Sequence, residues 1–362
     1  MDCCNDGPAL ARAPTAKKAT LRRNQGSRFS RRSLLQGAGV LAGASLLSGC
    51  GWFGARDRVR IAFCSQLLCV VPYEVTASAG HFADQELDVE LVYSQGGGAA
   101  MQALSAGAVE YAATSFDAFA QARVEGASVR RFASTGRLPL FALATSPDAA
   151  GEITGLEDLE GRTVGVAALG NADHSILLYL LTQAGIDPDS VSFATVGTNA
   201  FDVLRIGDVD AGMVQEPALT LLEDEGARVL FNAMDIDDAE EQFGGPYEFM
   251  GVAVRDGEIE ERRGEMQRVA HALAAGLETT RSLPGSELID ALPAELVAGE
   301  DTGLLADILD RYRTSLYPTG VEIDPPSVQR ALDSLLASGA IESDLDLDDI
   351  LDLEVLETEG VR

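Results

Sequence analysis

The residues with the clearest potential for ligand chemistry follow two apolar segments in the first third of the chain. Val89, Leu91 and Tyr93 alternate with polar or small residues, which predicts a strand. This strand runs into a glycine triplet and a helix that ends near Gly107. A second short strand, Tyr111–Thr114, leads into a hydroxyl, an aromatic ring and a carboxyl group. In open α/β sheets such junctions lie at the carboxyl ends of the strands, where ligands bind. We therefore expect ligand contacts from Gly97, Gly98, Ser115, Phe116 and Asp117.

The same kind of junction recurs later in the chain and supplies a second set of candidates. Arg137 could clamp a sulfonate or a carboxylate with its planar guanidinium, or pair with a surface acid. His174 could donate to a ligand or stand exposed in the first turn of a helix. Any single candidate could instead be an ordinary capping or turn residue. The further candidates are Gln66, Gly170, Asn171, Gln215 and Glu216.

No residue pattern indicates catalysis, a cofactor or a metal centre. The chain has three histidines and contains no H-E-x-x-H, no G-x-S-x-G and no phosphate-loop lysine. Cys64 and Cys69 form a C-x4-C pair on the first candidate ligand loop, and could form a disulfide, remain thiols, or bind a soft metal with His174. We expect a binding protein without a cofactor rather than an enzyme.

Three phrases resemble the solute-binding proteins of ABC importers for nitrate, sulfonates, taurine and thiamine precursors. They are 87–115 around the glycine triplet, Leu156–Val166 with Arg162 in place of a lysine, and Gln215-Glu216-Pro217 in place of W-E-P. The resemblance implies a two-lobed periplasmic-binding-protein type II fold of α/β class, with a mixed sheet in each lobe and the ligand between the lobes. It also implies ligand contacts at the junctions named above. Residues 67–73 depart from the W-x-P-N of the pyrimidine-binding branch, which counts against a thiamine-pyrimidine ligand.

The lobes are expected to be discontinuous in sequence, with residues 57–138 and 250–362 in one and 139–249 in the other. Pro72 is expected in the first turn of a helix running towards Phe82, and residues 223–245 are expected to be irregular. The remainder of the chain reads as mostly helical, because apolar residues recur at three- and four-residue spacing. The expected helices are 258–281, 286–298, 303–313 and 326–338.

Residues 1–50 resemble an export leader. Ser30-Arg31-Arg32-Ser33-Leu34-Leu35 resembles the twin-arginine motif, and a short apolar stretch then ends in Leu47-Ser48-Gly49-Cys50, which resembles a lipobox. Lipidation of Cys50 would tether the exported protein to the outer face of the cytoplasmic membrane. Cys64 and Cys69 would then lie outside the cell, where disulfides persist.

The chain is strongly acidic, with a formal net charge of −30 at pH 7. Residues 1–49 hold eight of the 27 basic and two of the 57 acidic residues, including both lysines, so the exported part would be more acidic still. Dense carboxylates without lysine indicate adaptation to high salt, where ions screen the repulsion. Nucleic acid is disfavoured as a partner.

Together these features predict a monomeric, membrane-tethered protein that passes a small organic anion, a sulfonate, taurine-like compound or nitrate, to an ABC permease and its ATPase. The alternatives are binding of a thiamine-pyrimidine precursor, or a thiamine-pyrimidine synthase on the same scaffold.

Overall fold

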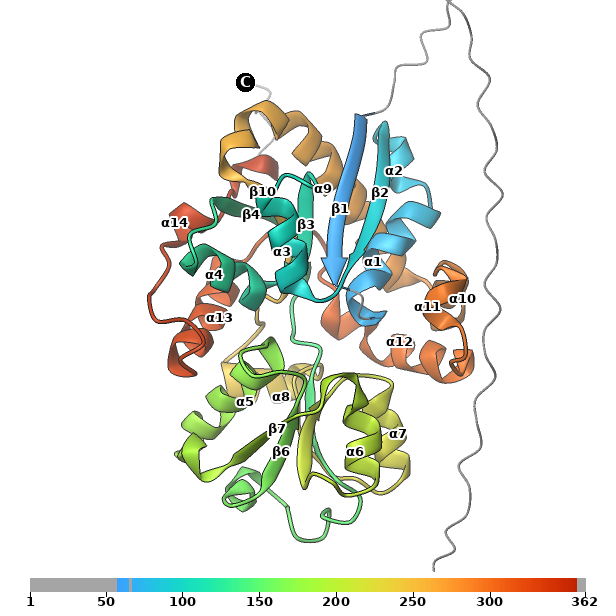
Figure 1. Ribbon diagram of the computed structural model, residues 1–362. Helices are drawn as coiled ribbons and strands as arrows, with labels where there is room; N and C mark the ends of the chain where they lie inside the picture. Colours follow the sequence, from blue (N-terminus) through green and yellow to red (C-terminus); the bar gives the residue numbers. More distant parts are fainter. Residues whose placement is uncertain (1–56, 65–66, 357–362) are drawn as a thin grey trace, which may run out of the picture. The chain divides into compact units, whose positions relative to one another are not determined.

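The computed structural model describes residues 57–64 and 67–356, which belong to one compact unit containing two five-stranded sheets (Figure 1). The first sheet has the order β2-β1-β3-β10-β4. Strand β1 runs parallel to β2 and β3, and β10 runs antiparallel to β3 and β4. Its strands are β1 (Asp57–Cys64), β2 (Leu87–Ser94), β3 (Tyr111–Ser115), β4 (Val129–Gly136) and β10 (Met250–Arg255).

The second sheet has the order β7-β6-β8-β5-β9, and here β5 is the antiparallel strand between β8 and β9. Its strands are β5 (Ala142–Thr145), β6 (Thr163–Val166), β7 (Ser192–Thr195), β8 (Ala211–Val214) and β9 (Val229–Asn232). The mixed two-sheet α/β fold predicted from the sequence is confirmed. We call the first sheet with its helices lobe 1 and the second lobe 2; the residues at which one lobe ends and the other begins stay a prediction.

Lobe 1 is covered by α1 (Leu67–Ser78), α2 (His81–Asp84), α3 (Gly97–Ser105), α4 (Phe116–Val124) and α9 (Ile259–Ser282). The expectation for Pro72 was wrong, since α1 begins five residues earlier and holds Pro72 in its interior. The first turn of α1 is apolar and buried, so tertiary packing outweighs the preference of proline for a first turn. Helix α1 packs against α9, where Gly276 leaves room for Thr76.

Lobe 2 carries α5 (Ala172–Gln183), α6 (Ala200–Arg205), α7 (Ala218–Asp224) and α8 (Ile236–Phe243). Residues 223–245 were wrongly expected to be irregular, because they contain β9 and α8. Asp235 caps α8 by accepting hydrogen bonds from the backbone N–H groups of Asp237 and Asp238. The acidic residues that suggested a loop form the polar face of an amphipathic helix whose Ala239 and Phe243 are buried.

The C-terminal part consists of helices, as expected, although the segment expected as one helix over 286–298 is split before Pro293. The helices are α10 (Gly285–Asp290), α11 (Ala294–Val297), α12 (Thr302–Leu316), α13 (Pro325–Ala337) and α14 (Leu347–Ile350). Short 3-10 turns lie at Leu156–Leu159, Pro188–Ser190, Gly197–Asn199, Asp256–Glu258 and Glu354–Leu356. No helix in the described part of the chain has the length and apolarity needed to cross a membrane.

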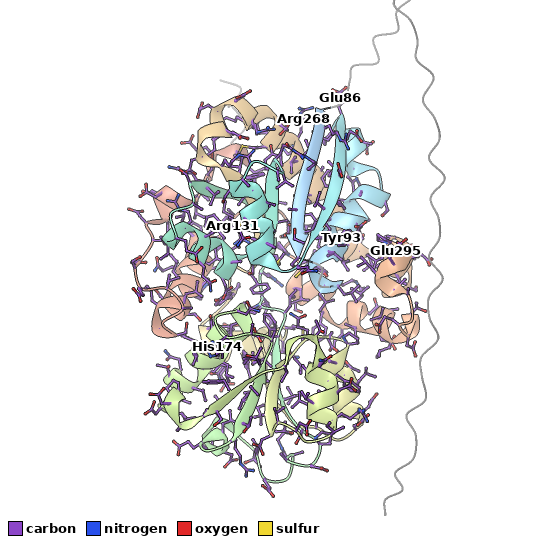
Figure 2. All side chains as sticks on the ribbon, in the orientation of Figure 1. Glu86, Tyr93, Arg131, His174, Arg268 and Glu295 are labelled. Atoms are coloured by element: carbon purple, nitrogen blue, oxygen red, sulfur yellow. The ribbon has the colours of Figure 1, made fainter. Side chains whose placement is uncertain are left out.

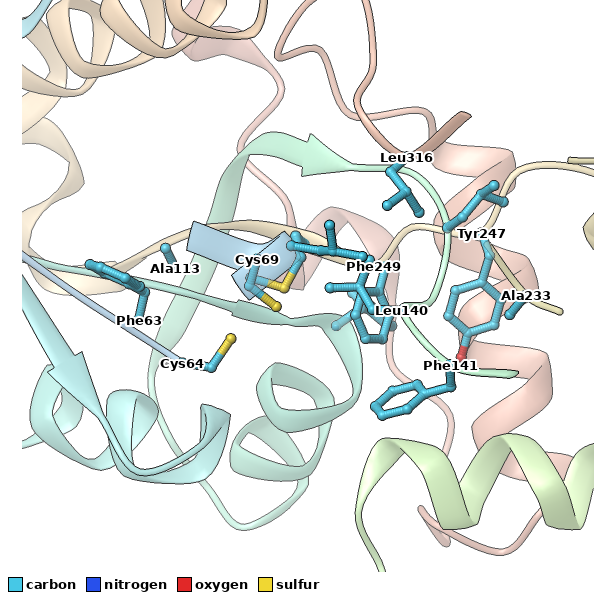
Figure 3. Close-up of a cluster of buried hydrophobic side chains, with 14 of the residues drawn as sticks. Phe63, Cys64, Cys69, Ala113, Leu140, Phe141, Ala233, Tyr247, Phe249 and Leu316 are labelled. Atoms are coloured by element: carbon cyan, nitrogen blue, oxygen red, sulfur yellow. The ribbon is translucent and has the colours of Figure 1, made fainter. Parts of the chain in front are cut away.

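The chain passes between the sheets twice, at residues 137–141 and 233–249, and these two crossings pair with each other. The N–H of Ala233 donates to the carbonyl of Phe141 at 3.0 Å, and the N–H of Tyr247 donates to the carbonyl of Arg137 at 2.9 Å. Buried apolar side chains from both crossings pack together, as Figure 3 shows for Leu140, Phe141, Tyr247 and Phe249. The lobes are therefore joined by a short paired connection rather than by a loose linker.

Candidate functional site

A cavity of about 680 Å³ lies between the two lobes and is lined by the ends of strands and the starts of helices from both. Lobe 1 contributes the loop into α3 and the junction of β3 with α4. Lobe 2 contributes the loops that follow β6, β7 and β8. Cavities of this volume suit small organic ligands. Parallel strands bring their carboxyl ends to one edge of a sheet, which is why residues far apart in sequence meet here.

The loop into α3 presents backbone to the cavity because its glycines leave space. Gly96 has a φ of 88°, a conformation that other residues rarely adopt. Gly97 lies against the start of α4, and a Cβ atom there would approach the Cβ atom of Ala118 to 2.8 Å and collide with Thr114. Gly98 faces open space. This wall is therefore backbone held close to the neighbouring helix.

Asp117 is the most unusual side chain of the lobe 1 wall. It lies in the first turn of α4 with 1% of its surface exposed, and neither carboxyl oxygen has a hydrogen-bond partner among the described residues. Burial raises its pKa to about 6; the charge of Asp173 acts in the same direction, and the guanidinium of Arg131 opposes it. The side chain before α4, Ser115, caps the helix by accepting from the N–H of Ala118 at 3.4 Å.

Behind this wall lies a buried guanidinium that does not itself line the cavity. Arg131, on β4, is fully buried and is labelled in Figure 2. Its Nη2 donates to the carbonyls of Thr114 and Phe249 at 2.8 and 2.9 Å, and its Nε is 3.5 Å from Oε1 of Glu248. Burial lowers the pKa of Arg131 and raises that of Glu248 to about 7. This ion pair holds the start of α4 against the second crossing.

The lobe 2 wall begins at the loop between β6 and α5. Asp173, in the first turn of α5, accepts a hydrogen bond from the N–H of Ala167, and burial raises its pKa. Gly170 and Asn171 line the cavity beside it. A hydrogen bond joins the two walls of the cavity, because Nε2 of Gln121 on α4 donates to the carbonyl of Gly170 at 2.8 Å. The two walls are thus in direct contact on this side of the cavity.

The loop after β8 completes the lobe 2 wall. Glu216, joined to Pro217 by a cis peptide bond, accepts from the N–H and the hydroxyl of Thr220 at 3.1 and 3.0 Å, and burial raises its pKa. Nε2 of Gln215 is buried in the cavity wall and has no partner among the described residues. In this loop the carboxyl group of Glu216 already accepts hydrogen bonds from the protein, whereas Nε2 of Gln215 has no acceptor among the described residues.

The cavity is closed at one end by thiols and aromatic rings. Cys64 and Cys69 are buried thiols without a disulfide between them, and they lie near Phe249 in Figure 3. Burial and the adjacent Cys64 raise the pKa of the Cys69 thiol. Among the described residues no group of three or more His, Cys, Asp or Glu side chains is arranged to hold a metal ion.

Most of the candidates chosen from the sequence lie together along this cavity: Gly97, Gly98, Ser115, Asp117, Gly170, Asn171, Gln215 and Glu216. Three do not line it. Phe116 packs under the guanidinium of Arg131, and Arg137 donates to the carbonyls of Thr314 and Ser315 at 2.8 Å each. His174, labelled in Figure 2, accepts from the N–H of Gly170 at 3.1 Å. Gln66 and Cys50 lie outside the described residues.

Several lining residues were missed by the sequence reasoning, notably Thr114, Asp173 and Gln121. Asp173 had a usable signal, because it lies two positions after Asn171 in the same predicted helix start. Thr114 ends a predicted strand and was treated as part of it. Gln121 had no local signal, since its role depends on the approach of the other lobe.

Comparison with known proteins places the chain in a family. Residues 70–286 match the family model described as "NMT1/THI5 like". No curated protein sequence matches the chain. Three solved structures illustrate the similarity in fold. One from Bordetella bronchiseptica RB50 has a TM-score of 0.71 at 23% identity, covering 84% of this chain and 96% of its own.

The second is the periplasmic aliphatic sulphonate binding protein SsuA from Escherichia coli, with a TM-score of 0.66 at 19% identity, covering 84% of this chain and 96% of its own. The third is the desulfurization enzyme DSZB, with a TM-score of 0.60 at 17% identity, covering 83% and 98%. Identities this low show a common fold and leave the ligand open. The matched family segment covers more than half of the sequence, and the chain belongs to the NMT1/THI5-like family.

Proposed function

We propose that the chain is the extracytoplasmic solute-binding subunit of an ABC importer. The observation that carries the proposal is the cavity between the lobes, whose polar lining comes from the strand ends of both sheets. Family membership supports it, and so does a solved structure of similar fold that is itself a periplasmic binding protein. Capture would proceed by bending at the paired crossings, which brings the two walls together around the solute.

The proposal includes export, a lipid anchor and a monomer that works with a permease and an ATPase. The support for export and anchoring is the order of sequence features, the twin arginine at Arg31-Arg32, the apolar stretch and the lipobox at Cys50. These residues lie outside the described part of the chain. A halophilic habitat would explain the net charge of −30 and the absence of lysine after Lys18.

For the solute, the sequence favoured a small organic anion such as a sulfonate, a taurine-like compound or nitrate. The sulphonate-binding structure of similar fold supports this class. Backbone N–H groups at the start of α3 could receive an acidic group, since that helix has no acidic residue in its first turn. Arg137 does not contribute, because its guanidinium is engaged by carbonyl groups outside the cavity.

A catalytic role on the same scaffold is the alternative, and the desulfurization enzyme of similar fold is the reason to test it. A synthase acting on a thiamine pyrimidine would use a reactive histidine in the cavity. His174 accepts a backbone hydrogen bond and is not among the lining residues, so we favour binding over turnover.

The experiment is equilibrium titration of the purified chain in high salt with alkanesulfonates, taurine, nitrate, carboxylates and thiamine precursors, followed by chromatography of the mixture. We expect saturable binding with the ligand recovered unchanged. Gln215→Ala should weaken binding, whereas Gln329→Ala, on the exposed surface of α13, should not. Conversion of any compound, or binding that survives in Gln215→Ala unaltered, would contradict the proposal.

A further inference from the structure

Three residues that line the cavity, two from lobe 1 and one from lobe 2, carry buried polar atoms without a hydrogen-bond partner among the described residues. Both carboxyl oxygens of Asp117, Oγ1 of Thr114 and Nε2 of Gln215 have no hydrogen-bond partner among the described residues, and all three residues line the cavity. Asp117 and Thr114 are each 1% exposed. Buried polar groups are normally hydrogen-bonded, because leaving one unpaired costs its full desolvation. Since all three residues line the cavity, an occupant of the cavity could supply the missing partners.

The charges of the lining limit what that occupant can be. The ionisable carboxyl groups along the cavity are Asp117, Asp173 and Glu216, and no Arg, Lys or His is among the described lining residues. Asp173 and Glu216 already accept hydrogen bonds from protein groups. Asp117 is thus the carboxyl group with both oxygens available to a ligand.

The N-terminal turns of the helices at the cavity also disfavour an anion. The starts of α4 and α5 would favour an anion, but each already carries a carboxyl group in its first turn, Asp117 and Asp173 respectively. Arg131 provides one positive charge behind the wall, and it is shared with Glu248 and two backbone carbonyls. A simple anion entering the cavity would therefore meet like charge at close range.

A bound metal ion does not fit these observations. No group of three or more His, Cys, Asp or Glu side chains in the described part of the chain is arranged as a metal site. Hard cations take six or more oxygen ligands, and a cavity of about 680 Å³ leaves room for an organic molecule. The donor is therefore an N–H or O–H group of an organic solute, and the acidic lining favours the N–H of a cationic group over a neutral hydroxyl.

We propose that Asp117 is the specificity-determining residue of the site and accepts a hydrogen bond from an ammonium or amino nitrogen of the solute. The solute is then an amine, an amino acid-like zwitterion or an aminoheterocycle, and not nitrate or an unsubstituted alkanesulfonate. Nε2 of Gln215 donates to an acceptor elsewhere on the same solute. The inference rests on the proposed function and narrows its solute class, since it retains solutes that carry an amino group, such as a taurine-like compound, and excludes nitrate and simple alkanesulfonates.

The competing arrangement is a protonated Asp117 that donates to an oxygen of an anion, and the sign of the pH dependence separates the two. The pKa of Asp117 is about 6, with Arg131, Asp173 and the hydroxyl of Tyr247 as the neighbouring titratable or charged groups. An ammonium donor depends on the charge of the ionised carboxylate, so its binding weakens by about tenfold between pH 7 and pH 5. Binding of an anion through a protonated Asp117 would strengthen over the same range.

The experiment titrates the full chain with compounds paired by skeleton: 2-aminoethanesulfonate against ethanesulfonate, 3-aminopropanoate against propanoate, and 4-aminopyrimidine against pyrimidine, with nitrate added alone. We expect the amino member of at least one pair to bind about tenfold or more tightly than its partner. Asp117→Asn should remove most of that advantage, because the amide has no charge and only one acceptor oxygen, whereas Asp208→Asn, at an exposed loop position, should retain it in full.

The outcomes distinguish this inference from the function on which it rests. If ethanesulfonate, propanoate or nitrate binds as tightly as the amino compounds, or if Asp117→Asn retains the preference, the inference is wrong and the solute-binding function stands. If the folded chain binds none of these compounds and native mass spectrometry finds no co-purified solute, both are wrong.

Discussion

The buried ionisable groups around the cavity lower the stability of the ligand-free protein and leave hydrogen-bonding atoms for a ligand. Asp117 loses its hydration on folding, and its own backbone N–H and the nearby Arg131 offset this loss only in part, so the ionised form is disfavoured in the folded state. A residue chosen only for stability would not be a carboxyl group at this position. The same unpaired oxygens leave the site ready to accept a solute without first breaking an internal bond.

Asp117→Asn should therefore stabilise the ligand-free protein. Its folded pKa of about 6 lies above the ordinary value of 3.8, so the folded state binds the proton more tightly than the unfolded state. The stability of the native protein should fall as the pH rises from about 4 to about 6, and this contribution should vanish in the variant. We expect a gain of up to about 3 kcal/mol at pH 7.

Urea unfolding at several pH values between 4 and 7 measures this gain, with the exposed Asp208→Asn as the control. A variant that is less stable than the native protein at pH 7 would show that Asp117 has a stabilising partner in the folded protein.

Arg131→Met should destabilise the protein strongly. The guanidinium satisfies two backbone carbonyls and faces the buried carboxyl group of Glu248. Its removal leaves a buried charge without its counterion, which costs about 3–5 kcal/mol. Since burial raises the pKa of Glu248 to about 7, lowering the pH from 8 to 5 should restore part of the loss as that group is protonated.

A double-mutant cycle tests whether Arg131 and Glu248 stabilise each other. Adding Glu248→Gln should cost less than the sum of the two single changes, measured by urea unfolding. Additive losses would mean that Arg131 acts through its backbone hydrogen bonds and its packing on Phe116 and Phe119, and not through Glu248.

For single residues, the sequence predicted which positions line the cavity better than it predicted what each side chain contacts. Ser115 and Asp117 were expected at the cavity from the strand-to-helix pattern, and both line it. Arg137 was selected for its charge, but side-chain direction decides contact, and its guanidinium turns to the carbonyls of the C-terminal helices. Arg131 was overlooked although neighbouring residues of a strand point to opposite faces, so one of Arg130 and Arg131 had to face inward.

Among the elements, α3 shows how a glycine run fixes the distance between helices. It packs on β3 and α4, and the contact with the start of α4 is made at Gly97, whereas Gly98 borders open space. The two glycines are adjacent in sequence and both line the cavity, so they form a matched pair for substitution.

Gly97→Ala should destabilise the protein by about 1–3 kcal/mol, because the new methyl group must displace Thr114 or Ala118. Gly98→Ala should leave stability unchanged or raise it by about 0.5–1 kcal/mol, since alanine restricts the unfolded chain and favours a helix. Urea unfolding of both variants provides the comparison. Equal effects at the two positions would contradict the close packing of α3 on α4.

Helices with periodic apolar residues could be predicted from the sequence. Helices whose bounds depend on packing against other parts of the protein could not. Helices α9, α12 and α13 lie within a few residues of their expected ranges. Helix α8 was hidden by its acidic residues, because composition was weighed above the spacing of Ala239 and Phe243. The early start of α1 depends on burial against the rest of lobe 1, which no local pattern records.

For the whole molecule, the paired crossings and the bond from Gln121 to Gly170 join two lobes that each carry part of the lining. The net charge acts on this assembly as a whole. With a formal charge of −30, the folded chain holds its carboxylates closer together than the unfolded chain does, so self-repulsion weakens folding.

Added salt should therefore raise the melting temperature, and the form of the rise identifies the cause. The screening length falls from about 10 Å at 0.1 M to about 3 Å at 1 M, so repulsion between surface carboxylates is largely removed by 1 M. Screening predicts that most of the rise occurs below 1 M and is equal in NaCl and KCl. Sucrose, which stabilises by exclusion from the surface, serves as the uncharged control. A melting temperature that is flat from 0.05 to 1 M, or that rises only with sucrose, would show that repulsion between surface carboxylates does not limit the stability of the fold.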